Sequence, residues 1–195
     1  MTTSRSFTAS LRPASLGLVL AVLTILFSQG IGIVFGLNED AIKSRLKTSA
    51  AAVRDTVYKG DDAAIKAVLD KSWGYMQRAH LHGGGMGTTA LALIVLVGLI
   101  GASRLVTTAV SLGLGAGGLG YSIFWMWAGF CAPALGSTGL AKESLKWLAM
   151  PSSGAFVVAT LAMPSSGAFV VATLTVLVLL VVSLVRRPSS LSCDA

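Results

Sequence analysis

The chain has 195 residues, of which 54% are hydrophobic and only 12% are charged. A soluble globular domain carries about twice that share of charged residues, so the composition excludes an ordinary soluble enzyme and predicts one compact membrane domain. The net charge of +7 comes from scattered basic residues without interleaved aromatic residues, which excludes a nucleic-acid interface and favours contact with the headgroups of a lipid bilayer.

Four apolar runs, each about long enough to cross a bilayer, fill most of the chain. The first, residues 16–36, would form a helix of about 32 Å, against a hydrocarbon core of about 30 Å. Because backbone polar groups inside a bilayer must pair within the chain, such runs cross it as helices. The predicted fold class is therefore all-α, an integral membrane bundle of four transmembrane helices at residues 16–36, 86–102, 105–130 and 168–185.

The segment between the first two runs, residues 38–82, predicts an amphipathic helical hairpin outside the membrane. Asn38 is a suitable N-cap ahead of two acidic residues, and Gly60 can end the first helix of the hairpin. Asp61 or Asp62 can then cap the second helix, which leads directly into the membrane. The hairpin is predicted either to cap the bundle or to dock a partner.

Both histidines of the chain, His80 and His82, lie at the threshold of the second run, beside the glycines of residues 83–85. Neutral imidazole is a ligand for zinc, copper and haem iron, so the pair is the candidate metal or haem site. Side chains two residues apart on a helix point about 200° away from each other, so the two rings could share one ion only in an extended chain. The alternative is an interfacial pair next to glycines that break the helix before the membrane span.

Two short resemblances accompany these histidines. The Ala-His-x-His start of residues 79–82 is similar to segments of haem-containing and haem-copper membrane proteins, and this resemblance implies a bound haem. The chain has no further histidine, so a methionine or another subunit would have to supply the second ligand. Residues 82–85, His-Gly-Gly-Gly, resemble the oxyanion-hole motif of lipases and esterases, but no GxSxG nucleophile motif accompanies them. The sequence therefore predicts no enzymatic activity.

The third run is rich in glycine. Gly113 and Gly117 lie four residues apart, as do Ala116 and Gly120, which gives small-xxx-small faces that another helix can approach closely. The same stretch matches GxGxxG, but a dinucleotide site needs a βαβ unit that an apolar membrane run does not provide. The glycines therefore predict a helix-packing face, whose partner lies in this chain, in another membrane protein or in a second copy within a homo-oligomer.

Residues 148–160 and 161–173 repeat the same thirteen letters, LAMPSSGAFVVAT. Thirteen residues turn a helix by about 220°, so the two copies would present opposite faces to the same neighbours. The second copy is predicted to enter the last span. The first copy is predicted to be interfacial, re-entrant or a kinked helical extension, after a short interfacial helix near residues 142–148.

These features predict a small membrane protein with a non-enzymatic, structural or accessory role, because no acid or base inside the spans marks an ion path. A haem- or metal-binding protein that uses His80 and His82 is the second hypothesis, and a small transporter subunit is the third. Basic residues close to the spans, Arg104, Arg186 and Arg187, favour cytoplasmic N- and C-termini in a bacterial inner membrane, whereas a count over all loops favours the opposite orientation.

Overall fold

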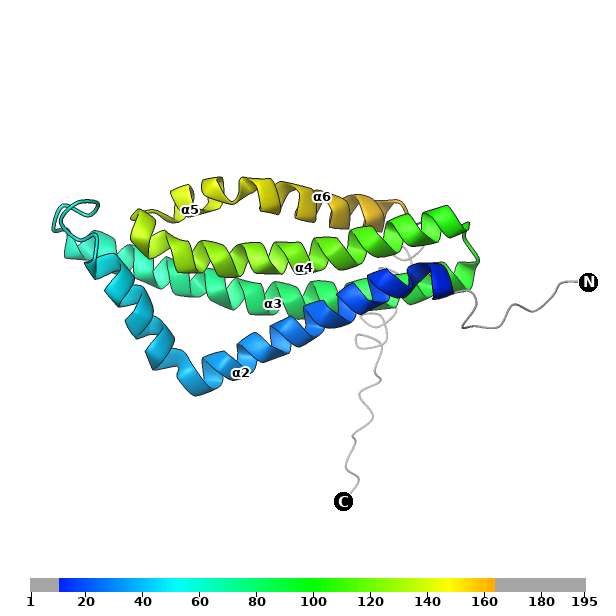
Figure 1. Ribbon diagram of the computed structural model, residues 1–195, viewed down its shortest axis with the longest axis horizontal. Helices are drawn as coiled ribbons and strands as arrows, with labels where there is room; N and C mark the ends of the chain where they lie inside the picture. Colours follow the sequence, from blue (N-terminus) through cyan, green and yellow to red (C-terminus); the bar gives the residue numbers. More distant parts are fainter. Residues whose placement is uncertain (1–10, 164–195) are drawn as a thin grey trace, which may run out of the picture. The chain divides into compact units, whose positions relative to one another are not determined.

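The computed structural model describes residues 11–163, and the regular secondary structure of these residues is entirely helical (Figure 1). The elements are η1 (Arg12–Ala14), α2 (Ser15–Ala51), α3 (Asp62–Ile100), α4 (Arg104–Leu135), α5 (Thr138–Ser144) and α6 (Lys146–Leu161). By length and composition, η1 with α2, α3 and α4 are each apolar enough to cross a membrane. The first three predicted runs therefore lie on membrane-length helices, and the fourth, residues 168–185, lies outside the described residues.

Helix α2 continues beyond the first apolar run and bends at Asn38. This residue has φ −133° and ψ 25°, outside the helical region, and helical geometry resumes directly after it. The chain beyond the bend then runs back towards the start of α3 (Figure 1). Asn38 therefore separates two helical segments that share the label α2, at the residue where the sequence predicted that a helix begins.

Helix α3 joins the predicted second helix of the hairpin to the second apolar run without interruption. Asp61 caps its N-terminus, since the Asp61 carboxylate accepts a hydrogen bond from the backbone nitrogen of Ala64 at 2.9 Å. Gly101, with φ 74°, ends the helix in the left-handed conformation. The prediction that residues 83–85 break the helix is wrong. Gly83 instead faces α2, where a Cβ would lie 2.9 Å from the Cβ of Ser28, so its missing side chain allows close helix packing.

Helices α2, α3 and α4 each contact the other two, and glycines set the distance between them. A Cβ built on Gly115 of α4 would lie 2.6 Å from the carbonyl oxygen of Gly17 in α2. A Cβ on Gly87 of α3 would lie 2.7 Å from Cγ1 of Ile25 in α2, and one on Gly129 of α4 would lie 2.6 Å from Cγ of Met76 in α3. The three helices are therefore closer together than any side chain at these positions would allow.

The connection between α2 and α3, residues 52–61, packs on the end of α4. The buried Tyr58 hydroxyl donates a hydrogen bond of 2.8 Å to the carbonyl oxygen of Pro133, in the last turn of α4. Burial raises the pKa of the Tyr58 hydroxyl above its ordinary value. Lys59 and Gly60 then take positive φ angles of 54° and 76° to reverse the chain. The Tyr58–Pro133 hydrogen bond thus joins this connection to α4.

The segment predicted as a short helix near residues 142–148 is divided between α5 and α6. Leu145 lies between these two helices with φ −107° and ψ 12°. Helix α6 contains the whole first copy of the repeated segment, including Pro151, and runs antiparallel to α4 (Figure 1). The first copy therefore forms a regular helix packed against α4, and its predicted interfacial or re-entrant placement in a membrane stays a prediction.

Candidate functional site

His80 faces α2 and joins it to α3 through hydrogen bonds. The Ser28 hydroxyl donates to the His80 carbonyl oxygen at 2.6 Å, and Nδ1 of His80 lies 2.8 Å from the Ser28 carbonyl oxygen. Because a carbonyl oxygen only accepts, Nδ1 carries the ring proton in this arrangement. Gly32 leaves room for the ring, since a Cβ there would lie 2.8 Å from Cε1 of His80. The imidazole therefore forms a contact between two helices.

His82 faces α4 and belongs to an aromatic cluster. Its ring centroid lies 5.3 Å from that of Tyr121 and 6.0 Å from that of Trp125. The guanidinium of Arg78 lies 5.1 Å from the Trp125 centroid and 5.4 Å from that of Tyr75, within the range of cation–π attraction. The ammonium nitrogen of Lys142, in α5, lies 5.9 Å from the Tyr75 ring centroid. The cluster thus joins α3, α4 and α5 through ring and cation contacts.

The two histidines cannot bind one ion together in this geometry. They lie two residues apart on a continuous helix, and their rings contact different neighbouring helices. Within residues 11–163, no group of three or more His, Cys, Asp or Glu side chains is close enough to hold a metal ion. A metal or haem on either histidine would need its remaining ligands from elsewhere, so the arrangement by itself supports packing and hydrogen bonding.

The glycines of α4 predicted as a packing face lie against α6. A Cβ on Gly117 would lie 2.6 Å from the Ser152 carbonyl oxygen, one on Gly113 would lie 2.9 Å from Cβ of Ala159, and one on Gly120 would lie 3.2 Å from Cβ of Ser152. These three glycines therefore share one face, and their partner helix belongs to this chain. Ala116, the fourth residue of the predicted packing faces, is exposed.

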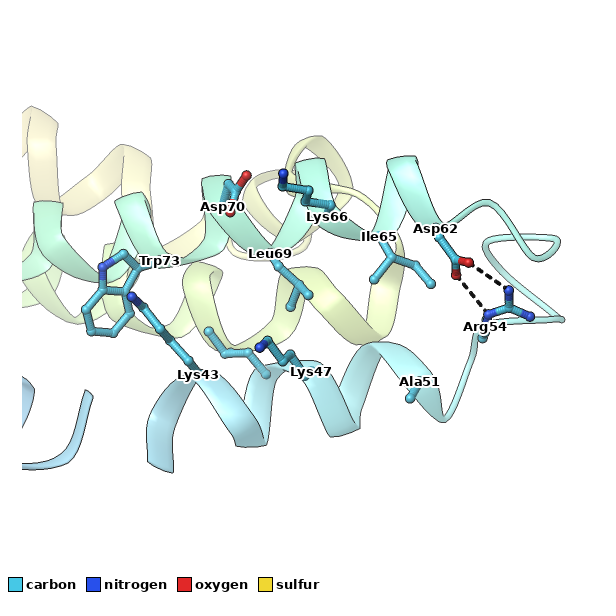
Figure 2. A pocket seen from close by; sticks show the side chains of 11 residues that line it. Lys43, Lys47, Ala51, Arg54, Asp62, Ile65, Lys66, Leu69, Asp70 and Trp73 are labelled. Atoms are coloured by element: carbon cyan, nitrogen blue, oxygen red, sulfur yellow. Dashed lines mark hydrogen bonds and ion pairs between the residues drawn. The ribbon is translucent and has the colours of Figure 1, made fainter. Parts of the chain in front are cut away.

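A groove of about 840 Å³, which sequence analysis did not single out, lies between the charged halves of α2 and α3 (Figure 2). One end is closed by Arg54, whose Nε and Nη2 lie 3.0 Å and 3.1 Å from the carboxylate oxygens of Asp62. At the other end the Trp73 ring contacts Phe35, with centroids 4.8 Å apart, and Lys43 lies 5.0 Å from the Trp73 centroid. The sequence shows the apolar stripes that line this groove, but the hollow depends on the bend at Asn38.

We expect Gly117→Ala to destabilise the protein, because the new methyl group would overlap the backbone of α6. The cost of such overpacking is about 1–3 kcal/mol in the free energy of unfolding, measurable by thermal or detergent denaturation of the purified protein. Gly30→Ala is the matched control, since a Cβ at Gly30 meets nothing within 4 Å. The control should be neutral or stabilising by up to about 1 kcal/mol. Equal stability of the two variants would contradict the close α4–α6 contact.

Comparison with known proteins identifies no relative of this chain. No protein-family model, curated protein or solved structure matches the chain. The contacts and charges of residues 11–163 are therefore the basis for proposing a function.

Proposed function

We propose that this chain is a non-enzymatic integral membrane protein with four crossings and a charged headpiece on one side, and that its role is structural or accessory to a larger membrane complex. The headpiece consists of residues 39–78 and 136–147. The fourth crossing that we propose is the apolar run at residues 168–185.

The distribution of charge along the helices carries this proposal. Between residues 11 and 163, every charged residue lies in the headpiece except Arg12 and Arg104, which mark the other end of the bundle. All acidic residues of this part of the chain belong to the headpiece. An ion or proton path normally uses ionisable residues inside the membrane, and the two histidines beyond the headpiece are engaged with other helices, His80 with Ser28 of α2 and His82 with the Tyr121 ring of α4. The charge pattern therefore supports a scaffold over a transporter.

The outer face of α2 supports insertion in a bilayer. Leu26 is 60% exposed and Ile33 is 62% exposed, and only 22% of the most apolar part of this helix is buried within the bundle. A continuous apolar face of this kind needs either lipid or a protein partner. The glycine face of α4 is occupied by α6, so a partner protein or a second copy would bind the headpiece or the lipid-facing helices.

The orientation that we propose places the headpiece outside and both termini in the cytoplasm of a bacterial cell. Arg12 and Arg104 lie at the end of the bundle opposite the headpiece, and Arg186 and Arg187 follow the fourth apolar run. Short, basic flanks of this kind are retained on the cytoplasmic side. The headpiece mixes acidic and basic residues in the manner of a small translocated domain.

Labelling of single cysteines in intact cells tests this topology. In a Cys131→Ser, Cys193→Ser background, Lys59→Cys lies in the headpiece turn and Ser189→Cys follows the last apolar run. A membrane-impermeant maleimide should label position 59 in intact cells and position 189 only after permeabilisation. Labelling of both positions in intact cells would contradict the four-crossing arrangement.

The size of the particle extracted from native membranes tests the accessory role. We expect a mild detergent to release a complex heavier than the 20.0 kDa chain, with a second polypeptide at fixed stoichiometry by light scattering and mass spectrometry. Reversing exposed headpiece charges with Lys142→Glu and Lys146→Glu should weaken that complex, whereas Arg12→Gln at the opposite end should not. A particle that contains only this chain would overturn the accessory role.

A further inference from the structure

The groove in the headpiece has the size and lining of a ligand site. We propose that it binds one single-chain anionic lipid, a long-chain carboxylate taken from the adjacent membrane leaflet, with its acid group at Lys47 and its chain along Leu46, Ile65 and Leu69. This inference goes beyond the structural role of the bundle, because it assigns a ligand to the headpiece.

The dimensions favour a small amphiphile over a partner helix. The two walls run from Lys43 to Arg54 and from Asp62 to Trp73, and each wall is about 16 Å long at the helical rise. The volume of about 840 Å³ lies within the range of about 300–1,000 Å³ that is typical of small-molecule sites. An α-helix about 10 Å wide and 16 Å long would occupy about 1,250 Å³. The groove is therefore smaller than a helix of the same length, which favours a narrower ligand.

The lining is apolar along its length. Leu46 is buried at 2% exposure, and Ile65 and Leu69 are half-buried. Figure 2 shows Ile65 and Leu69 extending from α3 towards the opposite wall formed by α2. Methylene groups placed against these side chains would leave water, and the removal of apolar surface from water favours binding.

The charges of the groove point to a singly charged head. Lys43 pairs with Glu39, and Arg54 pairs with Asp62. Lys47 and Lys66 line the groove without an ion pair to any residue between 11 and 163. Asp70, which forms no ion pair with another described residue, lies on the α3 wall, so the α2 wall with Lys47 is the favourable side for an anion. One carboxylate would neutralise the charge of Lys47.

The bilayer has a direct route to the groove. The lipid-facing side of α2 ends at Leu37, which is 78% exposed, directly before the bend. Phe35 on the same stretch contacts Trp73 at the membrane-side end of the groove, whereas the Arg54–Asp62 pair closes the outer end. A chain that diffuses along α2 would therefore reach the groove at Trp73.

Photolabelling of the full-length protein in phosphatidylcholine liposomes tests the proposal. A palmitate analogue with a diazirine near the end of its chain is added, and labelled residues are mapped by mass spectrometry. We expect adducts within residues 43–73 and a loss of about fivefold in Lys47→Glu. Lys71→Glu, an exposed charge reversal outside the groove lining, is the matched control and should label as the unmodified protein does.

Several results would overturn the carboxylate site. These are adducts confined to the lipid-facing residues 16–37, equal labelling by the matching alcohol probe, or displacement by lysophosphatidylglycerol but not by unlabelled palmitate. Leu69→Trp is a second variant, in which the larger side chain fills the groove. Leu69 is half-buried, and the denaturation curve of the variant shows whether it folds. Adducts that persist in a folded Leu69→Trp protein would show that the chain does not lie in the groove.

Discussion

Glycine residues at the helix crossings are the feature on which the rest of this structure depends. A Cβ at Gly115, Gly117 or Gly129 would lie closer than 3.0 Å to backbone or side-chain atoms of the neighbouring helix. Lipid tails are as apolar as leucine, so helices in a membrane gain little from burying large side chains against one another. Close backbone contact, with its dispersion energy and short hydrogen bonds, supplies the association instead. The helices of the bundle therefore contact one another most closely at glycine residues.

The same close packing explains the roles of the polar residues near the membrane threshold. Gly32 leaves space for the His80 ring, whose Nδ1 donates to the Ser28 carbonyl oxygen, while the Ser28 hydroxyl donates to the His80 carbonyl oxygen and so also joins α2 to α3. His82 instead meets Tyr121 on α4. With the apolar helices fixed in this way, the charged halves of α2 and α3 project beyond them and enclose the groove of the headpiece.

Length, apolarity and local capping were predictable from the sequence because they depend on neighbouring residues. The three membrane-length helices and the cap at Asp61 follow from such patterns. The continuity of the helix through residues 83–85 did not follow, because helix propensity suggests a break there, whereas the missing side chains of Gly83 and Gly84 allow close contact with α2. The sequence likewise grouped Ala116 with Gly120, whereas the structure groups Gly120 with Gly117 on the face that α6 covers. That grouping depends on the path of α6, which no local pattern specifies.

Disulfide trapping between α4 and α6 tests the central claim most directly. In a background without the native cysteines, Gly120→Cys is paired with Ser152→Cys, where the Cβ separation of 3.2 Å is near the value of about 3.8 Å found in disulfides. Gly154→Cys on the open side of α6, where a Cβ meets nothing within 4 Å, replaces Ser152→Cys in the control. The account predicts an intramolecular disulfide for 120 with 152 and none for 120 with 154. Covalent dimers through position 120, or equal trapping of both pairs, would contradict it and assign the glycine face of α4 to another chain.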